Sequence, residues 1–162
     1  SGITSPDINN GLGFRATLWV SGCDHFCKNC HNSRFSNPNY GRKFLEEDFN
    51  NLVSIVNKPY IKGLTLSGGD PLFVNNRQDI LTLILRIKDI LPTKDIWLYT
   101  GYYLHDIIKM DDPIINEILN NIDIIVDGPY IEAKRDLSIP FRGSTNQKIF
   151  KRGLDKWELF YE

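Results

Sequence analysis

The sequence predicts an α/β protein built as a partial, open (β/α) barrel of about four to six parallel strands. Short β-prone segments alternate with helical patterns along the chain, which is typical of right-handed βαβ units in a parallel sheet. The chain has 162 residues, whereas a closed eight-stranded barrel usually needs about 250. An open, doubly wound sheet fits the same pattern and stays an alternative.

The composition is that of a globular domain, with 41% hydrophobic and 24% charged residues, and we expect a single domain over residues 1–162. The 19 basic residues nearly balance the 20 acidic ones, which removes the electrostatic argument for binding nucleic acid or an anionic membrane surface. No apolar run reaches the roughly 18 residues of a membrane span, and the N-terminus lacks a signal-peptide pattern. We therefore expect a cytoplasmic protein that binds neither nucleic acid nor a membrane.

The first ordered element is expected at Phe14–Val20, a β-prone segment that ends in a Ser-Gly pair. Before it, Ile3–Gly13 is rich in Asn, Gly and Pro and is expected to form a surface lead-in with turns. Ser1 and Gly2 begin the sequence without a Met, and we expect them to lie outside the fold.

The middle of the chain predicts two helices around a strand. Apolar residues recur at helical spacing within Lys43–Lys58, and the acidic first turn suits the helix dipole. Ile61–Leu66 is a second short strand that stops at a Gly-Gly turn. Asp79–Leu91 is apolar around much of its circumference, as a helix between neighbours would be, and Pro92 ends it.

The last third predicts two more strands. Asp95–Thr100 and Asp123–Asp127 are β-prone. Helical stretches at Leu104–Met110 and Pro113–Asn121 separate them, and Asp112 is expected to cap the second helix. The tail after these elements is expected to add an edge strand or two.

Unusual residues follow each predicted strand. In parallel α/β folds, sites gather at the carboxyl ends of the strands, so these residues are expected to share one rim, although glycine after a strand also serves ordinary turns. They are the three cysteines, then Gly68, Gly69 and Asp70, then Thr100 and Gly101, and finally Asp127 and Gly128.

All three cysteines fall within eight residues, as Cys23-x3-Cys27-x2-Cys30. This clustering and the odd number argue against a disulfide framework. Three interpretations fit: a structural zinc site completed by His25 or His31, a redox pair of Cys27 and Cys30, or a four-iron cluster with one iron left open to substrate.

Five segments occur in order from Asp7 to Gln147: DINNGLGFRATLWVSGCDHFCKNCHN, LTLSGGDPL, WLYTGY, IIVDGPY and FRGSTNQ. The cysteine triplet followed by a Gly-Gly-acid turn resembles the radical S-adenosylmethionine superfamily. Within it, the chain is most similar to the activating proteins of anaerobic (class III) ribonucleotide reductases. The resemblance covers most of the chain.

The resemblance implies that Cys23, Cys27 and Cys30 ligate a [4Fe-4S] cluster whose open iron binds S-adenosylmethionine. Electron transfer from the cluster would then cleave S-adenosylmethionine to a 5'-deoxyadenosyl radical. The radical would remove a hydrogen from a glycine backbone carbon of the large subunit of the reductase. An electron donor such as a flavodoxin or ferredoxin is implied as a second partner.

The resemblance also implies which residues bind the cofactor. Asn29 and His31 would touch S-adenosylmethionine, although many members of the superfamily carry an aromatic residue where Asn29 stands. The amino end would be held by Gly68, Gly69 and Asp70, and the carboxylate or a monovalent cation would lie near Thr100 and Asp127.

Other functions remain open from the residues alone. One is a zinc-stabilised interaction module without catalysis, and another is a small radical enzyme that acts on a metabolite or on another glycyl radical enzyme. Arg142 fits contact with S-adenosylmethionine, with the partner or only with its neighbours.

Overall fold

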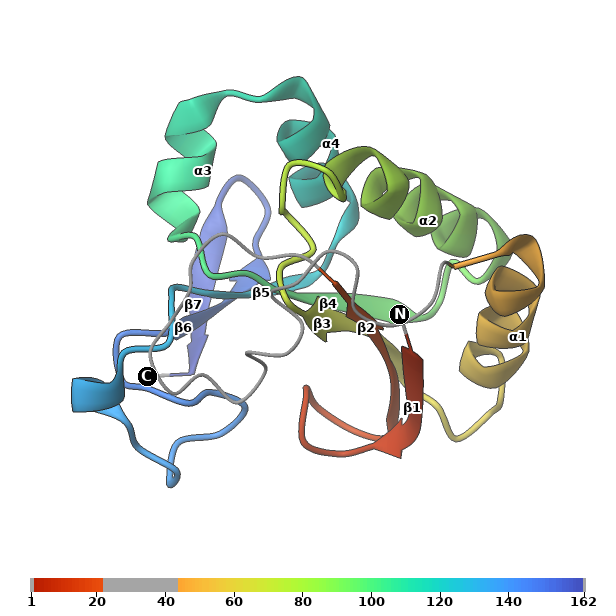
Figure 1. Ribbon diagram of the computed structural model, residues 1–162, viewed down its shortest axis with the longest axis horizontal. Helices are drawn as coiled ribbons and strands as arrows, with labels where there is room; N and C mark the ends of the chain where they lie inside the picture. Colours follow the sequence, from red (N-terminus) through yellow and green to blue (C-terminus); the bar gives the residue numbers. More distant parts are fainter. Residues whose placement is uncertain (1, 22–43, 162) are drawn as a thin grey trace.

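The computed structural model describes residues 2–21 and 44–161, which form a seven-stranded sheet with helices beside it (Figure 1). The strands are β1 (Gly2–Asp7), β2 (Arg15–Val20), β3 (Gly63–Gly68), β4 (Asp95–Tyr99), β5 (Ile124–Asp127), β6 (Lys148–Arg152) and β7 (Trp157–Tyr161). The helices are α1 (Glu46–Val56), α2 (Arg77–Ile90), α3 (Leu104–Met110), α4 (Pro113–Asn121) and a short 3-10 helix, η2 (Glu132–Lys134).

The sheet is parallel at its centre and antiparallel at its sides. Strands β2, β3, β4 and β5 pair in parallel, whereas β1, β6 and β7 each pair antiparallel with their neighbour. The outer strands follow their neighbours without a crossover helix, as antiparallel pairing allows. The fold is therefore a mixed α/β sheet, and the four central strands match those expected from the sequence.

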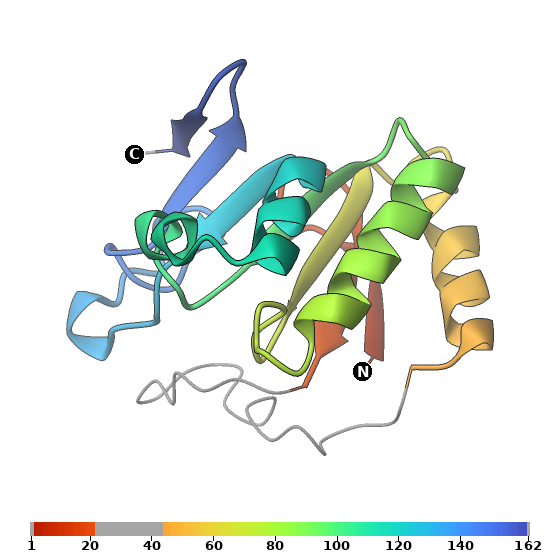
Figure 2. The same ribbon diagram turned by 90° about the horizontal axis from the view of Figure 1, so that it is seen from above.

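The strand order follows the chain from β1 to β7 without a reversal. Helices α1, α2 and α4 lie along the same side of the sheet (Figure 2), as consecutive right-handed crossovers require. A doubly wound sheet reverses its strand order where helices change sides. The described part of the chain contains no such reversal, so the doubly wound alternative is wrong for it.

The two faces of the central strands differ in polarity because successive side chains point to opposite faces. The face toward the helices is apolar and belongs to the main core, which includes Leu18, Leu64, Leu66, Ile96, Leu98 and Ile125. The opposite face is polar on β2 and β3, where it carries the buried residues Arg15, Thr17, Thr65 and Ser67. On β4 to β6 that face holds a second apolar cluster of Trp97, Val126 and Ile149.

The polar face is closed near the amino ends of the strands by Arg15, which has no exposed surface. Its Nη2 lies 2.6 Å from Asp95 Oδ1, and its Nε donates to Thr65 Oγ1 at 2.8 Å. Burial lowers the pKa of Arg15, an effect that the Asp95 carboxylate opposes. Arg15 Nη1 also donates to the carbonyl of Leu12, so this buried cation fixes the loop between β1 and β2.

The N-terminal segment differs from the sequence-based expectation. Gly2–Asp7 form β1, which pairs with β2, so the expected lead-in with turns is confined to residues 8–14, where the chain bends. Trp19 Nε1 donates to Thr4 Oγ1, and Thr17 Oγ1 donates to the buried carboxylate of Asp7. Backbone pairing with an existing strand needs no apolar pattern, which explains why the composition of this segment did not reveal the strand.

Helix starts follow the expected capping chemistry. The Asp112 carboxylate accepts from the backbone nitrogens of Ile114 and Ile115 at 2.8 and 3.0 Å, with Pro113 in the first helical position. Asp48, in the acidic first turn of α1, accepts from Leu45 N at 2.7 Å. The predicted cap at Asp112 is confirmed.

Candidate functional site

The carboxyl ends of the parallel strands, with the loops that follow them, form one edge of the sheet, which we call the rim. Several predicted site residues lie on it. Gly68, Thr100 and Asp127 stand at or directly after the carboxyl ends of β3, β4 and β5. Strand β2 ends at Val20, three residues before Cys23. The sheet therefore brings the base of the cysteine segment to the same edge as the Gly-Gly-Asp turn.

The Gly68–Gly69 turn lies directly against the end of β2. Gly68 has a φ of +118°, and a Cβ on it would stand 2.2 Å from the carbonyl oxygen of Val20. The backbone nitrogen of Gly69 donates to the same oxygen at 2.9 Å. Only glycine allows this approach and this backbone conformation together. The turn is thus joined to the strand that leads into the cysteines.

Asp70 is fully buried and links two loops of the rim. Its Oδ1 accepts from Leu72 N at 2.9 Å, whereas its Oδ2 accepts from Thr100 Oγ1 at 3.1 Å and from Gly101 N at 3.0 Å. The carboxylate therefore holds the loop after β3 to the loop after β4. Its expected contact with the amino end of S-adenosylmethionine stays a prediction.

Asn76 is a rim residue that the sequence did not single out. It occupies the N-cap position of α2, and its Nδ2 donates to the carbonyl of Ser21 at 2.7 Å and of Asp70 at 3.2 Å. An Asn before a helix is a recognisable capping signal. Its role as a link between the base of the cysteine segment and the Asp70 turn depends on tertiary contacts.

Asp127 holds the far end of the rim. Its Oδ2 accepts from Leu104 N at 2.8 Å and its Oδ1 accepts from Lys148 N at 3.1 Å. Burial raises the pKa of this carboxyl, and the two backbone hydrogen bonds oppose that rise. Asp127 thus orients the start of α3 and of β6, and its expected place near a methionine carboxylate or a monovalent cation stays a prediction.

Five predicted site residues lie outside the described residues, namely Cys23, Cys27, Cys30, Asn29 and His31. Among the residues that the structure does describe, no three His, Cys, Asp or Glu side chains come together to hold a metal ion. That the cysteine triplet ligates an iron-sulfur cluster stays a prediction, based on three thiolates on one short segment being able to ligate three irons.

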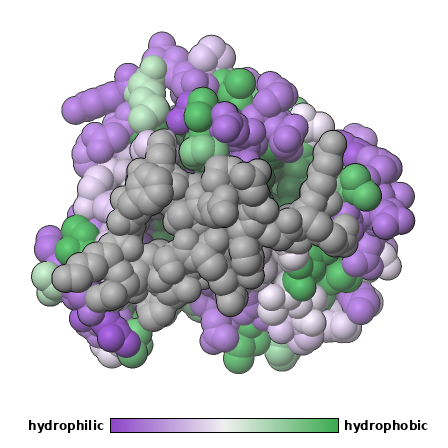
Figure 3. All heavy atoms as spheres, in the orientation of Figure 1, coloured by the Kyte–Doolittle hydropathy of each residue, from purple (hydrophilic) through white to green (hydrophobic). Residues whose placement is uncertain are grey.

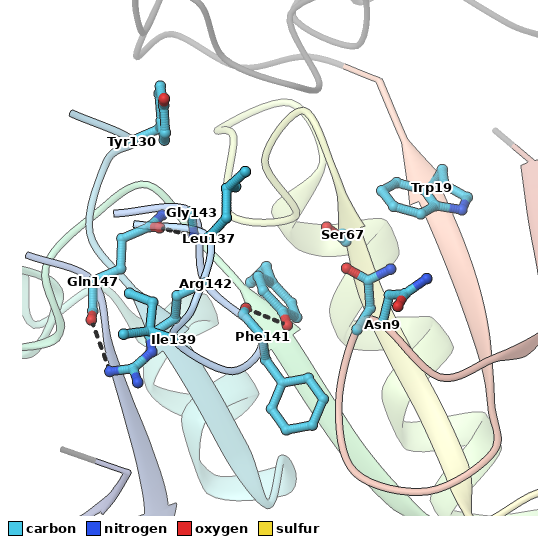
Figure 4. A pocket seen from close by; sticks show the side chains of 12 residues that line it. Asn9, Trp19, Ser67, Tyr130, Leu137, Ile139, Phe141, Arg142, Gly143 and Gln147 are labelled. Carbon is cyan, nitrogen blue, oxygen red and sulfur yellow. Dashed lines mark hydrogen bonds between the residues drawn. The ribbon is translucent and has the colours of Figure 1, made fainter. Parts of the chain in front are cut away.

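A cavity of about 500 Å³ opens on the polar face of the sheet. Figure 4 shows its two walls: Asn9 and Trp19 stand on the side of β1 and β2, and Leu137, Ile139 and Gly143 stand on the side of the tail. Ser67 and Tyr99, at the ends of β3 and β4, also line it.

The tail wall is built by the late Arg-Gly-Ser motif, whose side chains bond mostly to their own loop. Gln147 Oε1 accepts from Gly143 N and Ser144 N, and Gln147 Nε2 donates to the carbonyl of Gly128. Arg142 donates to the carbonyls of Pro140 and Gln147. Of the contacts considered for Arg142, the structure therefore shows the one with neighbouring residues of its own loop.

Comparison with known proteins matches the sequence of this chain to one family. A family model described as a 4Fe-4S single cluster domain matches residues 9–150. The anaerobic ribonucleoside-triphosphate reductase-activating protein of Enterobacteria phage T4 is 40% identical over 152 residues, which are 94% of this chain and 93% of that protein. The chain belongs to this family of activating proteins.

Two cellular relatives carry the same name. The activating protein of Vibrio cholerae is 40% identical over 147 residues, covering 90% of this chain and 92% of its own, and that of Escherichia coli K12 is 39% identical over 145 residues, covering 88% and 92%. The resemblance to activating proteins of anaerobic ribonucleotide reductases is confirmed. The four-iron domain favours the cluster interpretation of the cysteines over zinc or a redox pair.

Outside the grey region of Figure 3, the hydrophobic residues that this view shows form small, separate groups. None of the helices in residues 2–21 and 44–161 combines the length and apolar character needed to cross a bilayer.

Proposed function

We propose that this protein activates an anaerobic ribonucleoside-triphosphate reductase by removing a hydrogen atom from a glycine backbone carbon of that enzyme. Family membership carries the proposal, because curated relatives that share about two-fifths of their residues with the chain are named as activating proteins of this reductase. The position of the Gly68–Gly69 turn against Val20, at the end of the strand that precedes the cysteines in the sequence, supports it.

The residues present fit both cofactors. We assign Cys23, Cys27 and Cys30 as the ligands of the [4Fe-4S] cluster, and Asn29 and His31 as neighbours of S-adenosylmethionine. When bound, the two groups together supply one low-potential electron and a carbon radical able to take a hydrogen atom. Three cysteine ligands leave one iron free for S-adenosylmethionine, and the Gly-Gly turn offers backbone carbonyls that can accept from its ammonium group.

The rim fixes the loops that would hold the two cofactors relative to one another. Asn76 ties the base of the cysteine segment to the turn that contains Asp70, and Asp70 ties that turn to Thr100. Loops fixed to one another in this way hold a cofactor and a reacting carbon at constant separation, which lowers the entropic part of a barrier. The role of the rim is therefore to hold the loops in fixed positions, because its buried carboxylates accept hydrogen bonds from the backbone of those loops.

We also propose that the sheet is a single-domain partial barrel with an open flank through which the protein substrate reaches the site. The sequential strand order and the helices on one face support this architecture. A flavodoxin or ferredoxin would supply the electron. We expect the protein to act in the cytoplasm. The near balance of 19 basic and 20 acidic residues argues against nucleic acid or an anionic membrane surface as a partner.

Electron paramagnetic resonance tests the proposed function. The anaerobically reconstituted protein is mixed with S-adenosylmethionine, a reductant and the cognate reductase, and a glycyl radical doublet on the reductase is expected. The doublet should disappear when the target glycine of the reductase is changed to Ala. Efficient cleavage of S-adenosylmethionine without a radical on this reductase would contradict the proposal.

A further inference from the structure

Among the described residues that line the cavity on the polar face of the sheet, Arg142 is the one with a charged side chain. The described lining contains no carboxylate and no lysine. Arg142 uses its Nε and Nη1 on carbonyls of its own loop, and its Nη2 is buried without a hydrogen-bond partner among the described residues. Burial raises the pKa of the Tyr99 hydroxyl, so Tyr99 stays neutral and donates to the carbonyl of Phe141 at 2.8 Å.

This charge distribution restricts what the cavity can hold. A ligand with an ammonium or sulfonium group would find no described carboxylate in the lining to offset its desolvation. A neutral ligand that needs hydrogen bonds and some apolar contact meets both, because Ser67 and Asn9 stand with Leu137 and Ile139 around the same space (Figure 4). A peptide main chain is such a ligand, since each peptide unit is uncharged and has one donor and one acceptor.

Two polar side chains of the lining are available for such contacts. Neither the Ser67 hydroxyl nor the side-chain amide of Asn9 bonds to another described residue. Ser67 lies at the end of β3, only 3% exposed, and Asn9 lies in the loop between β1 and β2. The amide of Asn9 can donate and accept at once, which matches the pairing needs of a peptide unit.

The loop that carries Asn9 is held in place by hydrogen bonds with Asp7, Thr65 and Arg15. The carboxylate of Asp7 accepts from Asn9 N at 2.8 Å and from Asn10 Nδ2 at 2.8 Å. Thr65 Oγ1 donates to the carbonyl of Asn10 at 2.6 Å, and Arg15 binds both Thr65 and the carbonyl of Leu12. Such buried support fixes the backbone of Asn9, so little backbone entropy is lost when its side chain binds a ligand.

We propose that Asn9 is a positioning residue that hydrogen-bonds the extended main chain of the partner segment in this cavity, with Ser67 as a second contact. The inference rests on the proposed function, because it assumes that the occupant is the glycine-bearing segment of the reductase. The cavity recognises backbone rather than charged side chains. It therefore holds the main chain of the segment in place, whatever its side chains.

The test compares how many glycyl radicals form per S-adenosylmethionine cleaved, together with the dissociation constant of the complex with the cognate reductase. Asn9→Ala should lower the radical yield per cleavage and weaken the complex by about fivefold each, as expected for one net hydrogen bond. Ser67→Ala should lower the same ratio by less. Asn51→Ala, an exposed Asn on α1, is the matched control and should equal the parent protein in both measurements.

A conservative variant distinguishes a positioning role of the Asn9 side chain from a merely structural one. Asn9→Gln keeps the amide and should recover part of the radical yield per cleavage, while iron content and melting temperature match the parent in both variants. Unchanged yield and affinity in Asn9→Ala, or no recovery in Asn9→Gln, would overturn the inference. A parent protein that binds the reductase through Asn9 but forms no radical on it would instead contradict the proposed function.

Discussion

Asn76 donates a 2.7 Å hydrogen bond to the carbonyl oxygen of Ser21, a residue 55 positions earlier in the chain. The same amide nitrogen reaches the carbonyl of Asp70 at 3.2 Å. One side chain at the start of α2 thereby joins the base of the cysteine segment to the turn after β3.

Asn76→Ala is expected to lower the free energy of unfolding by about 1–2 kcal/mol, because both hydrogen bonds are lost. The variant should also lose iron faster than the parent under a chelator, since the base of the cysteine segment is no longer tied to the rim. Urea denaturation and iron analysis measure the two effects. Asn116→Ala removes an amide that bonds the exposed side chain of Asp111 and serves as control; equal iron loss in both variants would contradict the role of Asn76.

Gly68→Ala is expected to destabilise the protein by about 2 kcal/mol or more, because the added Cβ is strained at positive φ and must displace backbone. The carbonyl of Val20 stands 2.2 Å from the position of that Cβ, so β2 and β3 would have to separate at their ends. Gly2→Ala is the control, since nothing lies within 4 Å of its Cβ position. A Gly68→Ala protein as stable as the Gly2→Ala protein would show that the rim tolerates this separation.

The Asp127 carboxyl is expected to make stability depend on pH. Burial raises its pKa above the ordinary value of 3.8, so the folded chain holds this proton more tightly than the unfolded chain. Its contribution to stability is fully present below the unfolded pKa and is lost as the pH rises through the higher folded pKa.

Urea unfolding of the parent and of Asp127→Asn over roughly pH 3.5 to 7 measures this contribution. The stability of the parent relative to the variant should decrease as the pH rises, because the amide does not titrate. A difference that stays constant over this range would mean that the pKa of Asp127 is the same in the folded and unfolded chain.

Single replacement of Cys23, Cys27 or Cys30 by Ser is expected to prevent assembly of a complete four-iron cluster, since each thiolate is assigned to a different iron. The circular dichroism spectrum should stay close to that of the parent, because the sheet and the helices supply the described residues of the main core. Iron and sulfide analysis after anaerobic reconstitution decides the matter. A full complement of iron in any one variant would remove that cysteine from the ligand set.

The sequence by itself determined the parallel centre of the sheet, the helices between its strands and the edge that carries the predicted site residues Gly68, Thr100 and Asp127. Periodicity and turn residues are local signals, so they located β2 to β5, α1 to α4 and the Asp112 cap. The cysteine spacing and the Gly68–Gly69–Asp70 turn indicated the superfamily, and the five segments in order from Asp7 to Gln147 indicated the family, because each of these motifs is contiguous in the chain.

Only the tertiary structure decided how the rim is held together. Strand β1 depends on backbone pairing with β2, and the links from Asp70 to Thr100 and from Asn76 to Ser21 join residues 30 and 55 positions apart. The cavity that contains Asn9 and Ser67 likewise needs β3 beside the loop that follows β1. No local pattern encodes these contacts, because each one arises when separate segments are brought to the same face of the sheet.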